Sequence, residues 1–235
     1  MRDEMTAPAS TNAPVAWGES AVAVKICGVT SVQDATACVD AGADAIGVNF
    51  VRNSPRYCEP AAARRIVEAV GARALVVGVF VDASFDEIEA HKRDTGIGCV
   101  QLHGDEPPEL LERLLPHAYK GLRVRGATSI QDAQRYPGRY LLLDAYVPGV
   151  AGGSGTTFPW ALATEIARMR RVALAGGLDP HNVARAVAEV QPYCVDVASG
   201  VESAPGRKDL ARVRAFVSAA KSVAVASREH LRGSP

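Results

Sequence analysis

Two residues that could move protons stand where apolar runs end. Cys27 closes the run at residues 22–26 and is followed by Gly28, a turn residue. As a thiolate, this cysteine could take a proton from carbon. Its plainer interpretation is a small buried hydrophobe, which is what most free cysteines are. The choice between the two depends on where the fold places the end of this run.

Asp144 is the second candidate, because it ends the apolar run at residues 140–143. An aspartate after a strand often caps the next helix. The next helix is expected only near Thr157, too far downstream for such a cap. Carboxylates are almost never buried without a partner or a role, so the position favours a chemical function, such as proton donation.

Three glycine-containing segments follow apolar runs in the second half of the chain, at residues 152–156, 176–177 and 199–202. Glycine lets backbone N–H groups approach phosphate oxygens closely, and helix N-termini favour negative charge. We therefore expect a phosphorylated ligand. The predicted phosphate-binding residues are Gly153, Gly155, Gly176, Gly177, Ser199 and Gly200.

Other polar residues near run ends are equivocal. Arg56 could clamp a carboxylate with two hydrogen bonds, although most loop arginines are simply solvated. Gln101 and His103 share one face of a predicted strand, where a core histidine is about as plausible as a substrate contact. Lys25 and Asp196 are charges on predicted inward faces, and we expect them to pair with each other.

These residues must be positioned by a repeated unit of strand, turn and helix. Strands are expected at residues 22–27, 44–50, 75–81, 97–102, 119–124, 139–144, 171–175 and 193–198, and a last helix at about 207–224. Helix starts are predicted at Ser31 with Asp34, Ser84 with Glu87, Ser129 with Asp132, and Asp179 followed by Pro180.

Eight such units in about 200 residues predict a single α/β domain, a closed (β/α)8 TIM barrel, with the phosphate site at the C-terminal ends of strands 7 and 8. The rival is a doubly wound sheet, which would want a GxGxxG turn after its first strand. Residues 27–30 are nothing like one. We expect the barrel at residues 21–225, a disordered extension at 1–20 and a tail at 226–235. Active sites in this fold lie at strand C-terminal ends, which brings Cys27 and Asp144 to the same face.

Composition limits the partners. The chain has 235 residues with 26 basic and 26 acidic side chains, so nothing predicts binding to nucleic acid or to an anionic membrane. No apolar run is long enough to span a bilayer, and the N-terminal residues do not resemble a signal peptide. Five widely spaced cysteines without a CxxC pair predict neither disulfides nor a metal site. We expect a cytoplasmic protein, a monomer or weak homodimer, that binds a small metabolite.

Nine segments resemble the phosphoribosylanthranilate isomerase family of tryptophan biosynthesis, over about residues 22–220. They are KICG at Lys25, GAD-IG-F at Gly42, SPRY at Ser54, VGVFV at Val77, VQLHG at Val100, LLLDA at Leu141, GGSG at Gly152, LAGGL at Leu174 and DV-SGVE at Asp196. The set of KICG, QLHG, GGSG and SGVE, in that order, is highly specific.

The resemblance implies an Amadori rearrangement of N-(5-phosphoribosyl)anthranilate to 1-(2-carboxyphenylamino)-1-deoxyribulose 5-phosphate, without a cofactor. It implies that Cys27 is the general base, that Asp144 is the general acid, and that Arg56 contacts the anthranilate moiety. Two positions depart from the family: Asp82 stands where Asn is frequent, and Ala198 where Ser is common. They put only details of binding in question.

Three alternatives stay open from the sequence. A sibling barrel of histidine biosynthesis performs the same rearrangement, but it has an aspartate on strand one, where this chain has Cys27. A synthase barrel such as indole-glycerol-phosphate synthase would want a catalytic lysine at a strand end, and Lys25 lies one layer too deep. A non-catalytic metabolite-binding barrel would keep the phosphate loops without needing both Cys27 and Asp144.

Overall fold

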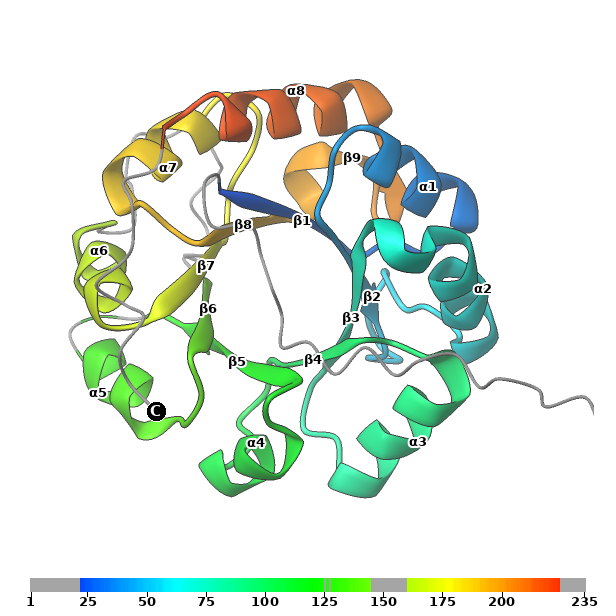
Figure 1. Cartoon of the computed structure of the whole chain (residues 1–235), viewed down its shortest axis with the longest axis horizontal. Helices are drawn as coiled ribbons and strands as arrows, with labels where there is room; N and C mark the ends of the chain where they lie inside the picture. The colour runs from blue at the N-terminus through cyan, green and yellow to red at the C-terminus, as the bar shows by residue number, and fades with distance from the viewer. Residues whose placement is uncertain (1–21, 125, 127, 145–159, 225–235) are drawn as a thin grey trace, which may run out of the picture.

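Eight parallel strands close into a barrel in the computed structural model, which describes residues 22–124, 126, 128–144 and 160–224. Figure 1 shows the helices as an outer ring around the strands. The strands are β1 (Ala23–Cys27), β2 (Ala45–Asn49), β3 (Leu75–Phe80), β4 (Cys99–Leu102), β5 (Ala118–Arg123), β6 (Tyr140–Asp144), β7 (Arg171–Ala175) and β8 (Cys194–Val197). The predicted TIM barrel is confirmed, and each predicted strand agrees within two residues at either end.

The outer ring consists of helices that follow their strands in the chain. They are α1 (Val32–Asp40), α2 (Pro60–Val70), α3 (Phe85–Thr95), α4 (Pro108–Leu114), α5 (Thr128–Arg135), α6 (Trp160–Met169), α7 (Val183–Val190) and α8 (Leu210–Lys221). Their buried faces pack on the outward side chains of the strands, such as Ile26, Ile46 and Leu143, which are fully buried. This apolar layer holds the strand ends, and hence the site, in fixed positions.

The barrel closes where β1 pairs with β8, with Lys25 opposite Asp196 in the register. Both side chains point into the barrel, and Lys25 Nζ lies 2.7 Å from Asp196 Oδ2. Their exposed fractions are 1% and 6%, so each charge depends on the other. The predicted pairing of these two residues is confirmed.

Two helix starts agree with prediction. The Ser31 hydroxyl accepts a hydrogen bond from the Asp34 backbone N–H at the start of α1. Ser84 and Glu87 form a full capping box at the start of α3, in which each side chain bonds to the other residue's backbone N–H. These bonds satisfy N–H groups that the first helical turn leaves unpaired.

Three predicted helix starts are wrong. Helix α5 begins at Thr128, which places Ser129 inside it. Helix α7 begins at Val183, because the Asp179 carboxylate accepts from the backbone N–H groups of His181 and Asn182 and caps the turn before the helix instead. Helix α8 begins at Leu210, after Asp209 as its N-cap.

Residues 202–208, partly assigned to that last helix by prediction, form a small hairpin. Its strands are β9 (Glu202–Ala204) and β10 (Arg207–Lys208), which follow the short 3-10 turn η2 (Ser199–Val201). Another 3-10 turn, η1 (Gly71–Arg73), follows α2. Figure 1 places β9 beside α1 and the end of β1. Residues 202–208, which come late in the chain, thus lie next to the end of the first strand.

The predicted tails at 1–20 and 226–235 lie outside the described residues. Within the described ranges, no helix is both long and apolar enough to cross a membrane.

Candidate active site

A cavity of about 280 Å³ opens at the C-terminal ends of the strands. Its lining combines strand-end side chains with loop residues: Cys27, Gly28, Asn49, Ser54, Arg56, Val79, Gln101, His103, Leu142, Asp144, Ala175, Gly176, Gly177, Leu178, Asp196, Val197, Ala198 and Ser199. Cys27 and Asp144 therefore border one space, although 117 residues separate them (144 − 27). Of the other predicted site residues that the structure describes, only Gly200 is absent from this lining.

Cys27 is partly buried at the end of β1, and the other four cysteines are buried free thiols. Room for its sulfur comes from the neighbouring strand, because a Cβ built on Gly47 would lie 2.8 Å from Cys27 Sγ. Burial raises the pKa of the Cys27 thiol, while the ammonium groups of Lys25 and Lys208 act in the opposite direction. The Asp196 carboxylate adds to the rise.

Asp144 ends a chain of hydrogen bonds that starts in the barrel core. Tyr119 Oη donates to Gln101 Oε1 at 2.9 Å, and Gln101 Nε2 lies 3.0 Å from His103 Nδ1. His103 Nε2 then lies 3.2 Å from Asp144 Oδ2. Burial raises the pKa of Tyr119 well above its usual value, so its hydroxyl stays a donor.

This chain fixes the tautomer of the histidine. Since the Gln101 carbonyl accepts from Tyr119, its amide N–H₂ faces His103 Nδ1, which must accept. The proton of the neutral ring is then on Nε2, and it is donated to Asp144. His103 and Gln101 are thus engaged with each other and with Asp144, while both still border the cavity.

Arg56 reaches the cavity from the loop after β2 and is held by a carboxylate. Its Nε lies 2.9 Å from Glu202 Oε1, and its Nη2 lies 2.6 Å from Glu202 Oε2. This hydrogen bonding raises the pKa of Arg56 still further. The arginine packs over Gly28, where a Cβ would lie 2.5 Å from Arg56 Cδ. It is therefore a fixed cation at the rim and not a solvated loop side chain.

The glycine-rich ends of β7 and β8 meet as expected, but their residues differ in position. Gly176, Gly177 and Ser199 line the cavity. Gly200 instead packs behind it, since a Cβ there would lie 2.0 Å from the Leu178 carbonyl oxygen. The absence of a side chain at Gly200 lets the two loops touch. Gly153 and Gly155, the other predicted phosphate-binding residues, lie outside the described residues.

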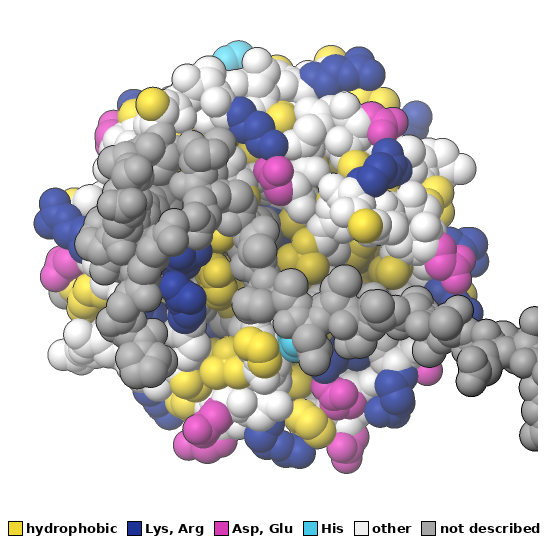
Figure 2. Space-filling model, in the orientation of Figure 1, with side chains coloured by type: hydrophobic (Ala, Val, Ile, Leu, Met, Phe, Trp, Pro, Cys, Tyr) yellow, Lys and Arg dark blue, Asp and Glu magenta, His cyan; other side chains and the backbone are white. Residues whose placement is uncertain are grey.

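No cluster of three or more His, Cys, Asp or Glu side chains suited to a metal occurs in the part of the chain described here. Figure 2 shows basic and acidic side chains interspersed around the rim of one face, with hydrophobic side chains gathered nearer its middle.

Sequence reasoning assigned no individual role to three residues of this region, namely Tyr119, Lys208 and Glu202, although Glu202 ends the SGVE segment. Of these three residues, only Tyr119 could have been found from the sequence, because the alternation of side chains along β5 places it on the inward face. Glu202 and Lys208 contact residues far away in the chain, so no local spacing could reveal their partners.

Comparisons with known proteins agree with the geometry. The family model described as N-(5'phosphoribosyl)anthranilate (PRA) isomerase matches residues 24–219. The N-(5'-phosphoribosyl)anthranilate isomerase of Geobacter sp. (strain M21) is 48% identical over 200 residues, which are 85% of this chain and 98% of that protein. The crystal structure of phosphoribosyl anthranilate isomerase from Thermotoga maritima superposes with a TM-score of 0.77 at 38% identity, covering 86% of this chain and 100% of that one.

A further solved structure of such an isomerase holds a ligand, reduced 1-(o-carboxyphenylamino)-1-deoxyribulose 5-phosphate. It has 37% identity and a TM-score of 0.77, and it covers 86% of this chain and 100% of that one.

Proposed function

Since the chain belongs to the N-(5'-phosphoribosyl)anthranilate isomerase family of enzymes, we propose that it rearranges N-(5-phosphoribosyl)anthranilate in tryptophan biosynthesis, with Cys27 as general base and Asp144 as general acid. The product is 1-(2-carboxyphenylamino)-1-deoxyribulose 5-phosphate. The observation that carries these roles is the common cavity that Cys27 and Asp144 border with the glycine-rich ends of β7 and β8.

The first step opens the ribose ring. Asp144 gives a proton to the ring oxygen, the bond between that oxygen and C1 breaks, and the nitrogen lone pair forms an iminium ion. His103 donates to Asp144 Oδ2 in the tautomer described above, so the transferred proton belongs on Oδ1. The histidine therefore orients the acid towards the substrate.

The second step moves a proton from carbon. The iminium ion acidifies the C2 hydrogen, and the Cys27 thiolate removes it to give an enolamine, which tautomerises to the ketose. Lys25 and Lys208 favour the thiolate against the burial that raises its pKa. This sequence needs no external oxidant, reductant or cofactor, because C2 is oxidised as C1 is reduced within the same molecule.

Two sets of groups that border the cavity would bind the substrate, one at its phosphate and one at its carboxylate, and so fix its orientation. Gly176, Gly177 and Ser199 lie where backbone N–H groups favour a phosphate. Arg56 offers a fixed positive charge for the anthranilate carboxylate. Orientation of this kind can lower a barrier by several kcal/mol, up to about 7–11 kcal/mol.

The proposal is tested by following the loss of anthranilate fluorescence when purified protein meets phosphoribosylanthranilate. We expect turnover by the unaltered chain, and a loss of about 10²–10⁴-fold in kcat for Cys27→Ala and for Asp144→Asn. Near-normal turnover in either folded variant would overturn the assigned role.

Matched controls exist in the same chain. Cys58→Ala removes a buried thiol, and Asp40→Asn removes a surface carboxylate that pairs with Arg73. Neither residue lines the cavity, so both variants should keep kcat within about twofold. Binding of the phosphoribosyl compound without conversion would favour the non-catalytic binding barrel.

The surroundings of the enzyme are proposed from its thiols and charges. All five cysteines are free, which suits the reducing cytoplasm. The balance of 26 basic and 26 acidic side chains gives no footprint for nucleic acid. We propose a monomer or weak homodimer acting on a small phosphoribosyl substrate.

A further inference from the structure

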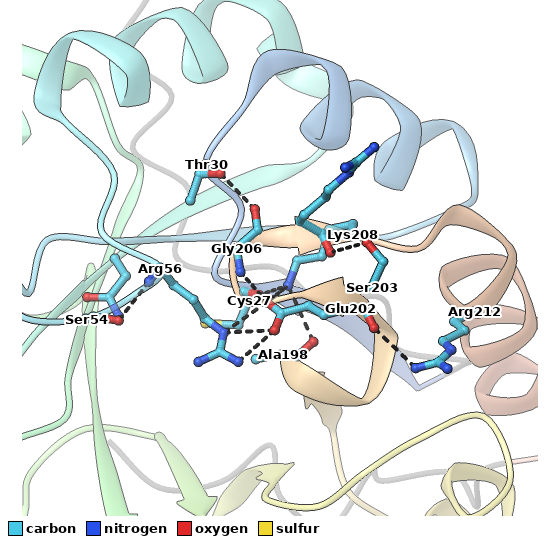
Figure 3. A network of polar contacts seen from close by, with 12 residues as sticks. Cys27, Thr30, Ser54, Arg56, Ala198, Glu202, Ser203, Gly206, Lys208 and Arg212 are labelled. Atoms are coloured by element: carbon cyan, nitrogen blue, oxygen red, sulfur yellow. Dashed lines mark hydrogen bonds and ion pairs between the residues drawn. The ribbon is translucent and has the colours of Figure 1, made fainter.

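The hairpin of β9 and β10 is bound to the start of the barrel by hydrogen bonds on both of its sides (Figure 3). Thr30 Oγ1 donates to the Gly206 carbonyl at 2.8 Å, and the Lys208 backbone N–H donates to Asp34 Oδ2 at 3.0 Å. Both partners follow β1, so the hairpin has a fixed position relative to Cys27.

Lys208 carries the first contact that matters for the site. Its side chain is 0% exposed, and Nζ donates to the Cys27 carbonyl at 2.6 Å, to Glu202 Oε1 at 2.8 Å and to the Ala198 carbonyl at 3.4 Å. These three bonds use all three N–H donors of the ammonium group. Lys208 joins the ends of β1 and β8 and has no donor left for a ligand.

Glu202 carries the second contact. Its carboxylate is 4% exposed, and it accepts from Lys208, from the Gly206 backbone N–H at 3.3 Å and from the Arg56 guanidinium. Figure 3 shows Glu202 between Lys208 and Arg56. Two cations against one anion leave this cluster with one net positive charge, next to Cys27.

We propose that Glu202 and Lys208 are positioning residues for two different parts of the reaction: Lys208 holds the end of β1 and places positive charge beside the Cys27 thiolate, and Glu202 aims Arg56 at the substrate carboxylate. This assignment of two roles rests on the proposed function, since it takes Cys27 as the general base and Arg56 as a substrate contact. The bonds themselves do not depend on it.

Charged side chains from several elements surround Cys27. Lys25 lies on its own strand, Asp196 on β8, Lys208 on β10 and Arg56 after β2. Lys25 is tied to Asp196, and it lowers the pKa of the Cys27 thiol by its charge and by a hydrogen bond, while Asp196 raises that pKa. Lys208 is the cation whose removal leaves the other ion pairs intact, because Glu202 keeps Arg56.

Two further titratable groups lie in or near the cavity: His103 borders it, and Tyr119 is buried in the barrel core, where it bonds to Gln101. Burial keeps Tyr119 neutral by raising its pKa well above its usual value. His103 is hydrogen bonded to Gln101 and Asp144 on both ring nitrogens. Neither group is touched by the variants below.

The first test measures the thiol without any substrate. Iodoacetamide alkylation of Cys27, followed by mass spectrometry across pH 6–10, reports its thiolate fraction. We expect Lys208→Met to move the profile to higher pH and to slow alkylation at pH 8 by about threefold or more, which corresponds to half a pKa unit. With phosphoribosylanthranilate, kcat should fall while KM stays within about twofold.

The second test examines the role of Glu202 separately from that of Lys208. We expect Glu202→Gln to raise KM by about threefold or more, because Arg56 loses its charged anchor, without slowing alkylation of Cys27. A merely structural role for both residues would instead change the same parameters in both variants. Should Lys208→Met not fold, Lys208→Gln keeps a hydrogen-bond donor without the charge and takes its place.

Lys221→Met is the matched control. Lys221 also donates to a carbonyl, that of Gly42, and to a carboxylate, that of Asp44, but it does not line the cavity. Its removal should leave both the alkylation profile and KM unchanged. An unaltered alkylation profile in the Lys208 variant, or an unaltered KM in Glu202→Gln, overturns the proposal. Because alkylation needs no substrate, its result stands even if the proposed reaction fails.

Discussion

The thiol of Cys27, our proposed general base, is surrounded by charges that act on it in opposite directions. Burial raises the pKa of Cys27, and the lysines on β1 and β10 counter that rise. A deeply buried thiolate would be costly to form, and an exposed one would react with other electrophiles. Partial burial beside two ammonium groups limits the contact of this thiol with solvent while its thiolate form is still favoured by nearby positive charge.

The carboxyl group of Glu202 makes the stability of the fold depend on pH. Burial alone would raise the pKa of its carboxyl, but hydrogen bonds from Arg56 and Lys208 hold the pKa below its usual value. The sign follows from linkage: a carboxylate with a depressed pKa stabilises the fold above its unfolded pKa, and this contribution is lost as pH falls through the folded value.

We therefore expect the stability gap between the wild type and Glu202→Gln to be largest near pH 6 and to shrink below about pH 4. Urea unfolding at a series of pH values measures it. A gap that grows on acidification would contradict the sign assigned to this carboxylate.

At the scale of elements, two loops touch where a glycine permits it. The turn η2 lies against the loop after β7, and a Cβ on Gly200 would lie 2.0 Å from the Leu178 carbonyl oxygen. Because both partners are backbone, neither can move without shifting a strand end. The phosphate site proposed between these loops depends on that contact.

We expect Gly200→Ala to lower the free energy of unfolding by about 1–3 kcal/mol through overpacking, and to raise KM for the phosphorylated substrate. Ser203→Ala, on the exposed part of the hairpin, is the comparison and should stay within about 0.5 kcal/mol. Denaturant melts and steady-state kinetics on both variants decide the matter, and equal behaviour of the two would count against a tight loop contact.

Sequence patterns predicted regular elements well and local departures poorly. Alternation along β1 and β8 fixes inward and outward faces, and these two strands are neighbours in a closed barrel, so the pairing of Lys25 with Asp196 could be predicted before any coordinates. The two-residue strand at Arg207–Lys208 has no periodicity to detect, and its residues read as the start of a helix. Asp179 resembles an N-cap, yet it caps an isolated turn.

The same distinction holds for the candidate site: its strand-end residues could be predicted from the sequence, and its long-range contacts could not. Cys27 and Asp144 were visible because each ends an apolar strand, and barrel topology brings strand ends together. The bonds from Glu202 to Arg56 and from Lys208 to the Cys27 carbonyl span 146 and 181 residues. Contacts this distant follow from the closed barrel and leave no trace in local spacing.

At the scale of the whole molecule, a buried ion pair crosses the seam where the first and last strands of the barrel pair with each other. Lys25 and Asp196 are nearly inaccessible to water, so removal of one partner leaves the other as an unpaired charge. The Asp196 Oδ1 atom already lacks a hydrogen-bond partner among the described residues.

We expect the single variants Asp196→Leu and Lys25→Met each to lower the free energy of unfolding by about 3–5 kcal/mol, and the double variant with both changes to recover much of that loss. Urea denaturation of the single and double variants forms the test. A double variant as unstable as the sum of both single changes would show that the two charges do not act as a pair.

The contact between Lys208 and Cys27 also bears on when the enzyme becomes active during its own synthesis. At about 5–20 residues per second, a ribosome needs about 10 to 40 s to add the 181 residues between them. A nascent chain that ends before residue 202 already contains the proposed base and acid, yet it lacks the hairpin that binds the first strand. Catalytic competence should therefore arrive late, only after the hairpin at residues 202–208 has been synthesised and has bound to the first strand.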